Sequence, residues 1–280
     1  MARWLVSVVI PTRNSAATLG LTLESLRRQT YREVEVIVVD NFSVDGTPDV
    51  ARRFGARVYS YGPERTAQMN FGARVARGDV LYFTNGDFWI SPRVVEECVE
   101  KIAEGFDAVV VPNISNPRRG LVARARYFER LSYLGSGVYE AARCMKREVF
   151  FKIGGFDESL YSNEDYDLHK RIVASGARVG YINAFEIHID EYTFRDLVLK
   201  SLYYGRNTVA YFRKWRDPLH MSPVRPTFFS RRYLSYLGSR WPLGIYFVIG
   251  LKLVQFFVAG VGAVLGLSTD PYRNTNRRSR

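Results

Sequence analysis

The sequence is poor in cysteine and histidine, with two of the first and three of the second among 280 residues. Cys98 and Cys144 each lie beside apolar or helix-like sequence, which favours small buried side chains over a nucleophile or a metal ligand. Zinc-finger spacing and an RRM-type aromatic signature are both lacking. These absences argue against a nucleic-acid-binding module, and no nucleic-acid partner is expected.

The opening residues also show no secretory-leader pattern, so none is expected. The chain opens MARWLVSVVIP, without the long apolar stretch and small-residue cleavage site of such a leader. Together with the low cysteine content, this predicts a reducing, cytoplasmic compartment. No internal repeat or low-complexity tract occurs, and the length allows one full-sized domain with an appendage.

Acidic residues are too few to balance the basic ones. Lys and Arg number 40 against 28 Asp and Glu, which gives a net charge of +12. A field of this sign attracts phosphates, nucleic acid or anionic lipid headgroups, and charge alone does not choose among them.

Apolar runs alternate with helical patterns through the first part of the chain. WLVSVVIP precedes the helical spacing of LGLTLESLRRQ, and VEVIVVD precedes an Asp-Gly turn and a second helix. This alternation predicts an α/β fold with a mostly parallel, doubly wound sheet. Ligands of such sheets bind at the carboxyl ends of the strands, where Asp40 and the group Asn85-Gly86-Asp87 stand. The stretch between residue 112 and residue 140 is expected to be irregular.

Near its C-terminus the chain changes character. WPLGIYFVIGLKLVQFFVAGVGAVLGL is apolar except for Lys252 and Gln255, and its length suits a membrane span. We therefore expect a catalytic domain over residues 1–215 and an interfacial and transmembrane helical region with a basic tail over residues 216–280.

The topology of this region stays open. Arginines flank the apolar run on both sides, so the positive-inside tendency draws both flanks to the cytoplasm. One tilted span, a re-entrant hairpin and helices lying in the interface all fit, and at least one insertion is favoured. Small residues in GVGAVLG raise the alternative of a homodimer.

Six motifs in order resemble the inverting glycosyltransferases of family 2, which have a GT-A (Rossmann-like) fold. They are VSVVIPTRN, VIVVDNFSVDGT, QMNFG, DVLYFTNGD, GGFDE and NEDYDL, and they cover roughly residues 5 to 190. The resemblance implies a nucleotide-sugar donor. It places Pro11, Thr12, Asn14 and Asp40 around the base and ribose, although Asn41 stands where relatives often have a second acidic residue.

The resemblance also implies a divalent metal, Mn²⁺ or Mg²⁺. The family's metal motif appears here as Asn85-Gly86-Asp87, with Asp87 as main ligand and Asn85 as a neutral oxygen that contacts the ribose or contributes weakly. His188 corresponds to a histidine that many relatives use as a further ligand. The structural alternatives are an Asn-Gly turn and a structural histidine.

By the same resemblance, Asp165 is the general base and Glu164 positions the acceptor or the sugar. Asp167 lies three residues after Glu164, so the assignment within this acidic trio stays open. An acidic helix N-terminus is the structural alternative. Arg65 and Gln68 are expected near the donor, and Arg206, in a loose match to the Gln-x-x-Arg-Trp element of processive synthases, is expected to reach a phosphate.

These residues predict transfer of a hexose, first mannose from GDP-mannose, to a hydroxyl of a lipid-linked or polymeric glycan at the cytoplasmic face of the cell membrane. UDP-glucose and UDP-N-acetylhexosamine are the next donors. A polyprenyl phosphate is the alternative acceptor, but a phosphate oxygen needs no base. A nucleotidyltransferase would carry a glycine-rich basic loop where this chain has TRNSAATLG. A non-catalytic, membrane-tethered nucleotide-sugar binder is the further alternative.

Overall fold

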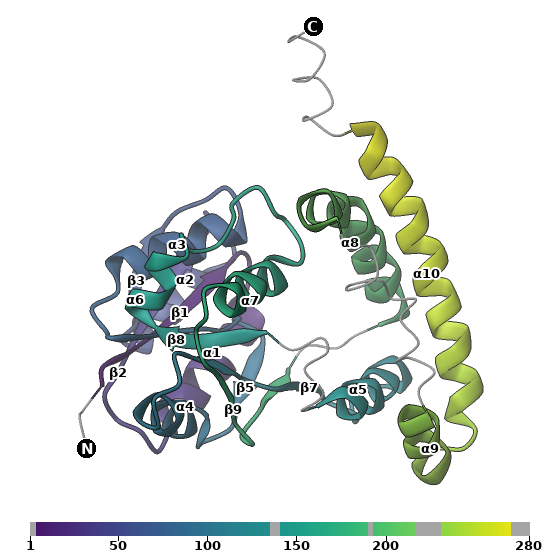
Figure 1. The fold of residues 1–280 in the computed structure, drawn as a ribbon, viewed down its shortest axis with the longest axis horizontal. Helices are drawn as coiled ribbons and strands as arrows, with labels where there is room; N and C mark the ends of the chain where they lie inside the picture. Colours follow the sequence, from purple (N-terminus) through teal and green to yellow (C-terminus); the bar gives the residue numbers. More distant parts are fainter. Residues whose placement is uncertain (1–3, 135–140, 190–192, 217–230, 270–280) are drawn as a thin grey trace, which may run out of the picture. The chain divides into compact units, whose positions relative to one another are not determined.

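The computed structural model describes residues 4–134, 141–189, 193–216 and 231–269 (Figure 1). Two compact units divide the chain. The first comprises Met1–Asn116, Tyr133–Glu158 and Glu164–Asp190, and the second comprises Pro117–Ser132, Ser159–Asn163 and Glu191–Arg280. The sequence had placed residues through 215 in the catalytic domain, whereas the compact units group residues 191–215 with the C-terminal helices.

The first unit is built on a seven-stranded sheet in the order β3-β2-β1-β4-β8-β6-β9. Its strands are β1 (Val6–Thr12), β2 (Val34–Asp40), β3 (Arg57–Ser60), β4 (Val80–Phe83), β6 (Ala108–Val110), β8 (Ala142–Lys146) and β9 (Val179–Tyr181). All described neighbours pair in parallel except β8, which is antiparallel to both β4 and β6. The expected mostly parallel α/β sheet is confirmed.

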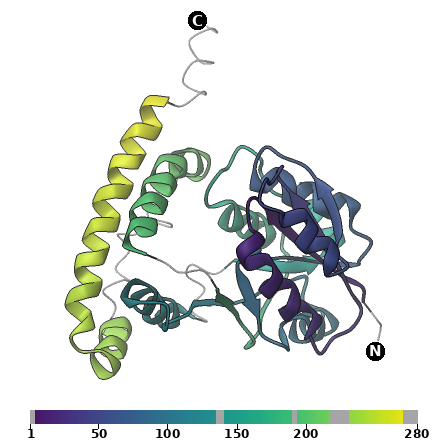
Figure 2. The same cartoon turned by 180° about the vertical axis from the view of Figure 1, so that it is seen from behind.

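Helices cover both faces of this sheet (Figures 1 and 2). One face packs α1 (Ala16–Arg27), α2 (Thr47–Arg53) and α4 (Val94–Ala103), and the other packs α3 (Arg65–Val75), α6 (Arg147–Lys152) and α7 (Glu164–Ala174). Along β1, Val8 joins the first core and Val9 the second. A strand buried on both faces needs a continuous apolar run, and the sequence has one.

A second, three-stranded sheet begins with the strand that follows β4 in the sequence. It contains β5 (Phe88–Ile90), β7 (Asn113–Ser115) and β10 (Glu186–His188), in the order β5-β10-β7. β10 is antiparallel to β5, with His188 opposite Phe88. This register brings the residue before β5, Asp87, beside the end of β10.

The second unit is helical. It contains α5 (Leu121–Tyr133), α8 (Phe194–Trp215), α9 (Arg231–Arg240) and α10 (Gly244–Thr269). The expectation of irregular structure before residue 140 is wrong for α5, because Val122, Ala125 and Phe128 form a buried face that packs with Val248 and Leu251 of α10. Gly244–Leu267 is long and apolar enough to cross a membrane, with a mean hydropathy of 2.1.

Candidate active site

The ends of β1 and β2 form the first part of the site. Thr12 and Asp40 are register partners and are 3% and 1% exposed. The Thr12 hydroxyl donates to Asp40 Oδ1 at 3.0 Å, and the Ser43 amide and hydroxyl donate to the same carboxylate at 2.8 and 2.6 Å. A carboxylate offers about four lone-pair sites, so Asp40 is held in place by three protein donors and retains capacity for one ligand donor.

The loops that follow these two strands are joined by Asn14. Its backbone amide donates to Ser43 Oγ at 2.7 Å, and its side-chain oxygen accepts from the Val44 amide at 3.0 Å. Asn14 adopts the left-handed region, with φ of 50°, which asparagine tolerates better than most residues. Pro11 lies inside β1, opposite Val39. Ser43 was missed by sequence reasoning, although it lies within the quoted VIVVDNFSVDGT motif.

Gln68 fastens the same two strands from α3. Its amide nitrogen donates to the carbonyl oxygens of Thr12 and Val39, and its side chain is buried. Gln68, which the sequence places near the donor, holds the ends of β1 and β2 together in the structure.

The Asn85-Gly86-Asp87 group follows β4. Gly86 is buried against the β1 loop, since a Cβ there would lie 3.4 Å from the Thr12 methyl group. Asp87 Oδ2 lies 3.8 Å from His188 Nδ1, and the two side chains are 32% and 23% exposed. The His188 ring also packs on Phe88, with ring centroids 4.2 Å apart. The structure therefore brings together two of the three expected metal ligands.

These two residues suit a divalent cation. A carboxylate oxygen from the turn before β5 and an imidazole nitrogen at the end of β10 are ligands that manganese accepts readily. Within the described part of the chain no three His, Cys, Asp or Glu side chains converge, so the remaining ligands would come from phosphate oxygens and water, as is usual for cations bound with nucleotides.

Arg65 links Asn85, the third expected metal ligand, to the acidic residues at the start of α7. At the beginning of α3, its Nη1 donates to Asn85 Oδ1 at 3.2 Å. Its Nη2 contacts the Glu164 carboxylate and lies 3.5 Å from Asp165 Oδ2. Residues far apart in sequence thus meet around one guanidinium. Within the pair, the Glu164 side chain is 7% exposed and that of Asp165 is 31% exposed.

The third acidic residue of α7 has a different role. Asp167 is fully buried, and Arg171 binds its Oδ2 through Nε at 2.9 Å and Nη2 at 2.7 Å. This intrahelical pair holds the Asp167 carboxylate inside the protein, whereas Glu164 and Asp165 both lie beside Arg65.

A buried ionic cluster that sequence reasoning missed supports β10. Glu186 accepts from Tyr82, from Thr84 at 2.6 Å and from the Arg143 guanidinium, which also donates to Val111 O at 2.9 Å. Burial and the adjacent Glu186 carboxylate raise the pKa of Tyr82 well above its ordinary value.

The same cluster extends toward the base candidate. Burial lowers the pKa of Arg143, but Glu186, Tyr82 and Asp165 outweigh it, and the net shift is upward. Glu186 is two residues before His188 on one strand, so both lie on the same face. The two-residue spacing of Glu186 and His188 in the EIHID motif was the sequence signal that could have indicated that Glu186 lies near the site.

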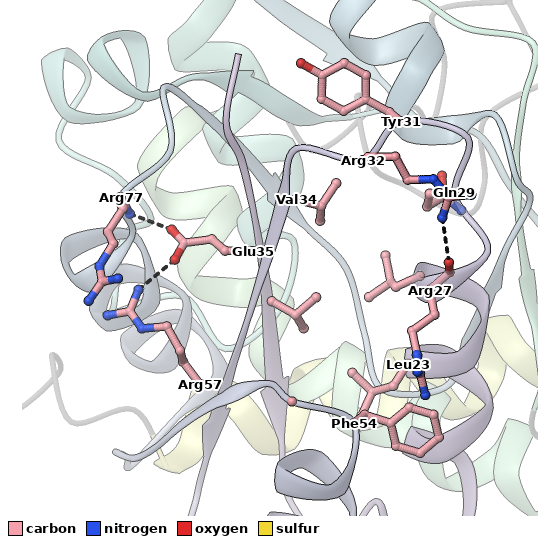
Figure 3. A pocket seen from close by; sticks show the side chains of 13 residues that line it. Leu23, Arg27, Gln29, Tyr31, Arg32, Val34, Glu35, Phe54, Arg57 and Arg77 are labelled. Atoms are coloured by element: carbon pink, nitrogen blue, oxygen red, sulfur yellow. Dashed lines mark hydrogen bonds and ion pairs between the residues drawn. The ribbon is translucent and has the colours of Figure 1, made fainter. Parts of the chain in front are cut away.

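Two further features lie elsewhere. Arg206 is carried by α8 in the second unit. A shallow hollow of about 440 Å³ opens where β2 and β3 begin (Figure 3), at the opposite end of the strands from Asp40. There Glu35 accepts from Arg57 at 2.8 Å and from the Arg77 amide. None of the candidate site residues described above lines this hollow.

The fold and sequence match known proteins. A mannosyltransferase from Pyrobaculum calidifontis, solved with GDP-Man and Mn²⁺, has a similar fold at TM-score 0.62 and 21% identity, covering 98% of this chain and 83% of that one. A pre-mycofactocin glycosyltransferase of Mycobacterium tuberculosis is 30% identical over 224 residues, which are 71% of this chain and 46% of the relative. The chain therefore spans about half the length of that relative.

A succinoglycan biosynthesis protein, ExoA of Rhizobium meliloti, is 26% identical over 249 residues, 78% of this chain and 75% of that protein. The family model described as glycosyl transferase family 2 matches residues 7–156, which hold the β1, β2 and β4 ends of the site. By this match and by its GT-A fold, the chain belongs to glycosyl transferase family 2.

Proposed function

We propose that this protein is a metal-dependent inverting hexosyltransferase that moves a sugar from a nucleoside diphosphate to a hydroxyl group of a lipid-linked or polymeric glycan at a membrane. The observation that carries the proposal is the convergence on Arg65. One guanidinium joins Asn85, at the end of β4, to Glu164 and Asp165, at the start of α7. A site for the leaving diphosphate and a site for a base are thereby adjacent.

The ends of β1 and β2 would hold the nucleoside. Asp40 is fixed by Thr12 and Ser43, so its remaining acceptor capacity is oriented before any ligand binds. Pre-orientation lowers the entropy that is lost on binding. Asn14 keeps the two loops together, and Gly86 lets the β4 loop approach them closely.

The metal would be held by Asp87 and His188, with Asn85 as a weak third oxygen. When bound, a divalent ion neutralises the negative charge that grows on the departing diphosphate. Both side chains are partly exposed, so they can meet a ligand from solvent. Mn²⁺ and Mg²⁺ are the candidates, and the imidazole favours Mn²⁺.

Asp165 would remove the proton from the acceptor hydroxyl as the new glycosidic bond forms. It is the more exposed member of the pair and stands in the first turn of α7. Glu164 is buried against Arg65 and would position that guanidinium, which can bind a diphosphate oxygen through its planar fork. Inversion would require the acceptor hydroxyl, activated by Asp165, to attack the anomeric carbon from the side opposite the leaving diphosphate.

We propose GDP-mannose as the first candidate donor, with mannose as the transferred sugar. UDP-glucose and UDP-N-acetylhexosamine are the next candidates. The mannosyltransferase of similar fold was solved with GDP-Man. A base is superfluous for a phosphate acceptor, so the Glu164-Asp165 pair favours a hydroxyl over a polyprenyl phosphate. The apolar helix α10 supports action at a membrane, for which the cytoplasmic side is our proposal.

The testing experiment measures nucleotide release by detergent-purified protein across GDP- and UDP-sugars, with Mn²⁺, Mg²⁺ or chelator. We expect release from one donor, abolished by chelator, by Asp87→Ala and by Asp165→Asn. Asp49→Asn is the matched control, because Asp49 is 71% exposed on α2. Donor binding without release, even with lipid-linked acceptors, would instead identify a nucleotide-sugar binder.

A further inference from the structure

The apolar helix α10 packs on one side against helices that carry charged residues. Gly244–Leu267 is, among the described residues, the one stretch that passes as a membrane span. Its 26-residue helix is about 39 Å long, against about 30 Å for a hydrocarbon core. Length alone would let it cross.

The first contact is an ion pair near the beginning of α10. Lys252 Nζ lies 2.6 Å from Glu129 Oε1 of α5, and the two side chains are 7% and 12% exposed. Around this pair, α5 and α10 share a core that includes Phe128, Val248 and Leu251. Lys252 lies about 12 Å along the helix from Gly244, so a crossing α10 would carry α5 and its charged residues into the hydrocarbon.

The second contact covers the other end of α10. A Cβ at Gly262 would overlap the Leu202 carbonyl oxygen of α8, and one at Gly266 would overlap that of Arg206. On the facing helix, Gly205 is equally close to Ala259. The two backbones therefore touch, and the small residues that raised the alternative of a homodimer are used within one chain (Figures 1 and 2).

α8 is unsuited to the interior of a bilayer. Its 22 residues include six charged ones: Arg195, Asp196, Lys200, Arg206, Arg213 and Lys214. Charged side chains in hydrocarbon are costly. Because α8 contacts residues 259–266 directly, it must lie at the same depth as the last third of α10. A perpendicular α10 would place α8 deep in the membrane.

One stripe of α10 stays open and is apolar. Tyr246, Leu253, Phe257 and Val264 are 77%, 62%, 74% and 66% exposed, and their spacing of seven, four and seven residues keeps them on one face. Arginines precede and follow the helix in the sequence, at 231, 232 and 240 and at 273, 277, 278 and 280. An apolar stripe between basic flanks is typical of a helix that lies in the headgroup region of an anionic leaflet.

We propose that the second unit is a monotopic anchor. α10 lies along one leaflet of an anionic membrane with its open stripe in the acyl chains, and it does not cross. The chain segment after α10 then stays on the same side of the membrane as the first unit. The inference is independent of the reaction that the first unit catalyses.

Cysteine labelling tests this directly, because the native Cys98 and Cys144 are buried. Ala103→Cys, on the exposed end of α4, reports the side of the first unit, and Ser279→Cys reports the side of the tail. Full-length variants in spheroplasts and inside-out vesicles are treated with a membrane-impermeant maleimide. Modification of both from the same side is expected; modification from opposite sides would overturn the proposal.

A second measurement tests the stripe. Phe257→Asp should lower the fraction bound to vesicles containing phosphatidylglycerol by about tenfold or more, given the apolar area that it removes. Val173→Asp is the matched control, since Val173 is 54% exposed on α7 of the first unit, and it should bind as the unmodified chain does. Equal binding of the two variants would contradict the role of the stripe. So would an unmodified chain that stays in the unbound fraction when vesicles are present.

Discussion

Neighbouring carboxylates at the start of α7 occupy different surroundings. The side chain of Glu164 is 7% exposed and contacts Arg65, whereas that of Asp165 is 31% exposed and lies 3.5 Å from the same guanidinium. A buried, paired carboxylate holds its partner in position, and an exposed one can meet a substrate. The two residues should therefore fail in different ways when they are changed.

Asp165→Asn should lower the transfer rate by about 10²- to 10⁴-fold, the range for loss of a general base, while nucleotide binding stays unchanged. Glu164→Gln should instead weaken donor binding, because Arg65 loses its main anchor. Initial rates and calorimetric titration of the nucleotide diphosphate separate the two effects. Weakened nucleotide binding by Asp165→Asn would contradict its assignment as a base.

The Arg143–Glu186 pair should matter for stability more than any exposed pair. Arg143→Met leaves a carboxylate of zero exposure without its cation, which costs about 3–5 kcal/mol of unfolding free energy. The control is Arg52→Met, because Arg52 and Asp49 are 62% and 71% exposed and such pairs contribute about 1 kcal/mol or less. Urea denaturation measures both, and equal losses would refute the structural importance of the buried cluster.

Close packing of α3 on the sheet depends on one glycine. A Cβ at Gly72 would overlap Val9 and lie 3.2 Å from Val39, so Gly72→Ala should destabilise the first unit by about 1–3 kcal/mol. Gly20→Ala on α1 is the matched control, because its Cβ would meet only ordinary contacts at 3.8 Å. That variant should gain about 0.5–1 kcal/mol from helix propensity. Thermal unfolding should thus give shifts of opposite sign, and a shared sign would contradict the packing argument.

Acidification should loosen α7 from β8. Burial lowers the pKa of His169, whose Nδ1 accepts from the Ala142 amide at 3.2 Å. The folded state therefore favours the neutral ring. Its contribution to stability is complete above the unfolded pKa of about 6.5 and is lost as pH falls below that value toward the folded pKa. His169→Gln keeps an acceptor without titrating, so chemical denaturation between pH 7 and 5 should show a smaller decline for this variant.

Strands and first helices could be predicted because their signal is local. The apolar run of β1 and the leucine spacing of α1 are readable without knowledge of neighbours. α5 escaped prediction, since its apolar residues are separated by arginines and acquire meaning only when Val248 and Leu251 of α10 cover them. Long-range packing determines whether such a segment forms a helix.

The candidate site follows the same division. The motif residues at the ends of β1, β2 and β4 were found by resemblance, and the structure links Thr12, Asn14 and Asp40 through Ser43 and direct hydrogen bonds. Ser43 and the Arg143–Glu186 pair were missed. The latter two residues are 43 positions apart, and their pairing depends on how β8 and β10 are placed, which local spacing does not encode.

The chain as a whole combines two compact units with different surfaces. The first buries Cys98 and Cys144 within a sheet and its helices, and its candidate site is lined by polar and charged side chains. The second exposes Leu253 and Phe257, which is unfavourable in water and favourable in lipid. Stability in the second unit therefore depends on contacts within it, and those contacts can be altered without changing nucleotide binding.

Gly262→Ala should destabilise the second unit, because the added Cβ overlaps the Leu202 carbonyl oxygen and separates α8 from α10. Gly260→Ala is the matched control two residues away, where a Cβ meets nothing within 4 Å and should add about 1 kcal/mol of helix propensity. Limited proteolysis in detergent should cut α8 faster in the first variant alone. Nucleotide titration should be unchanged in both, since Thr12 and Asp40 belong to the other compact unit. Equal resistance of the two variants would mean that backbone contact between α8 and α10 does not hold this unit together.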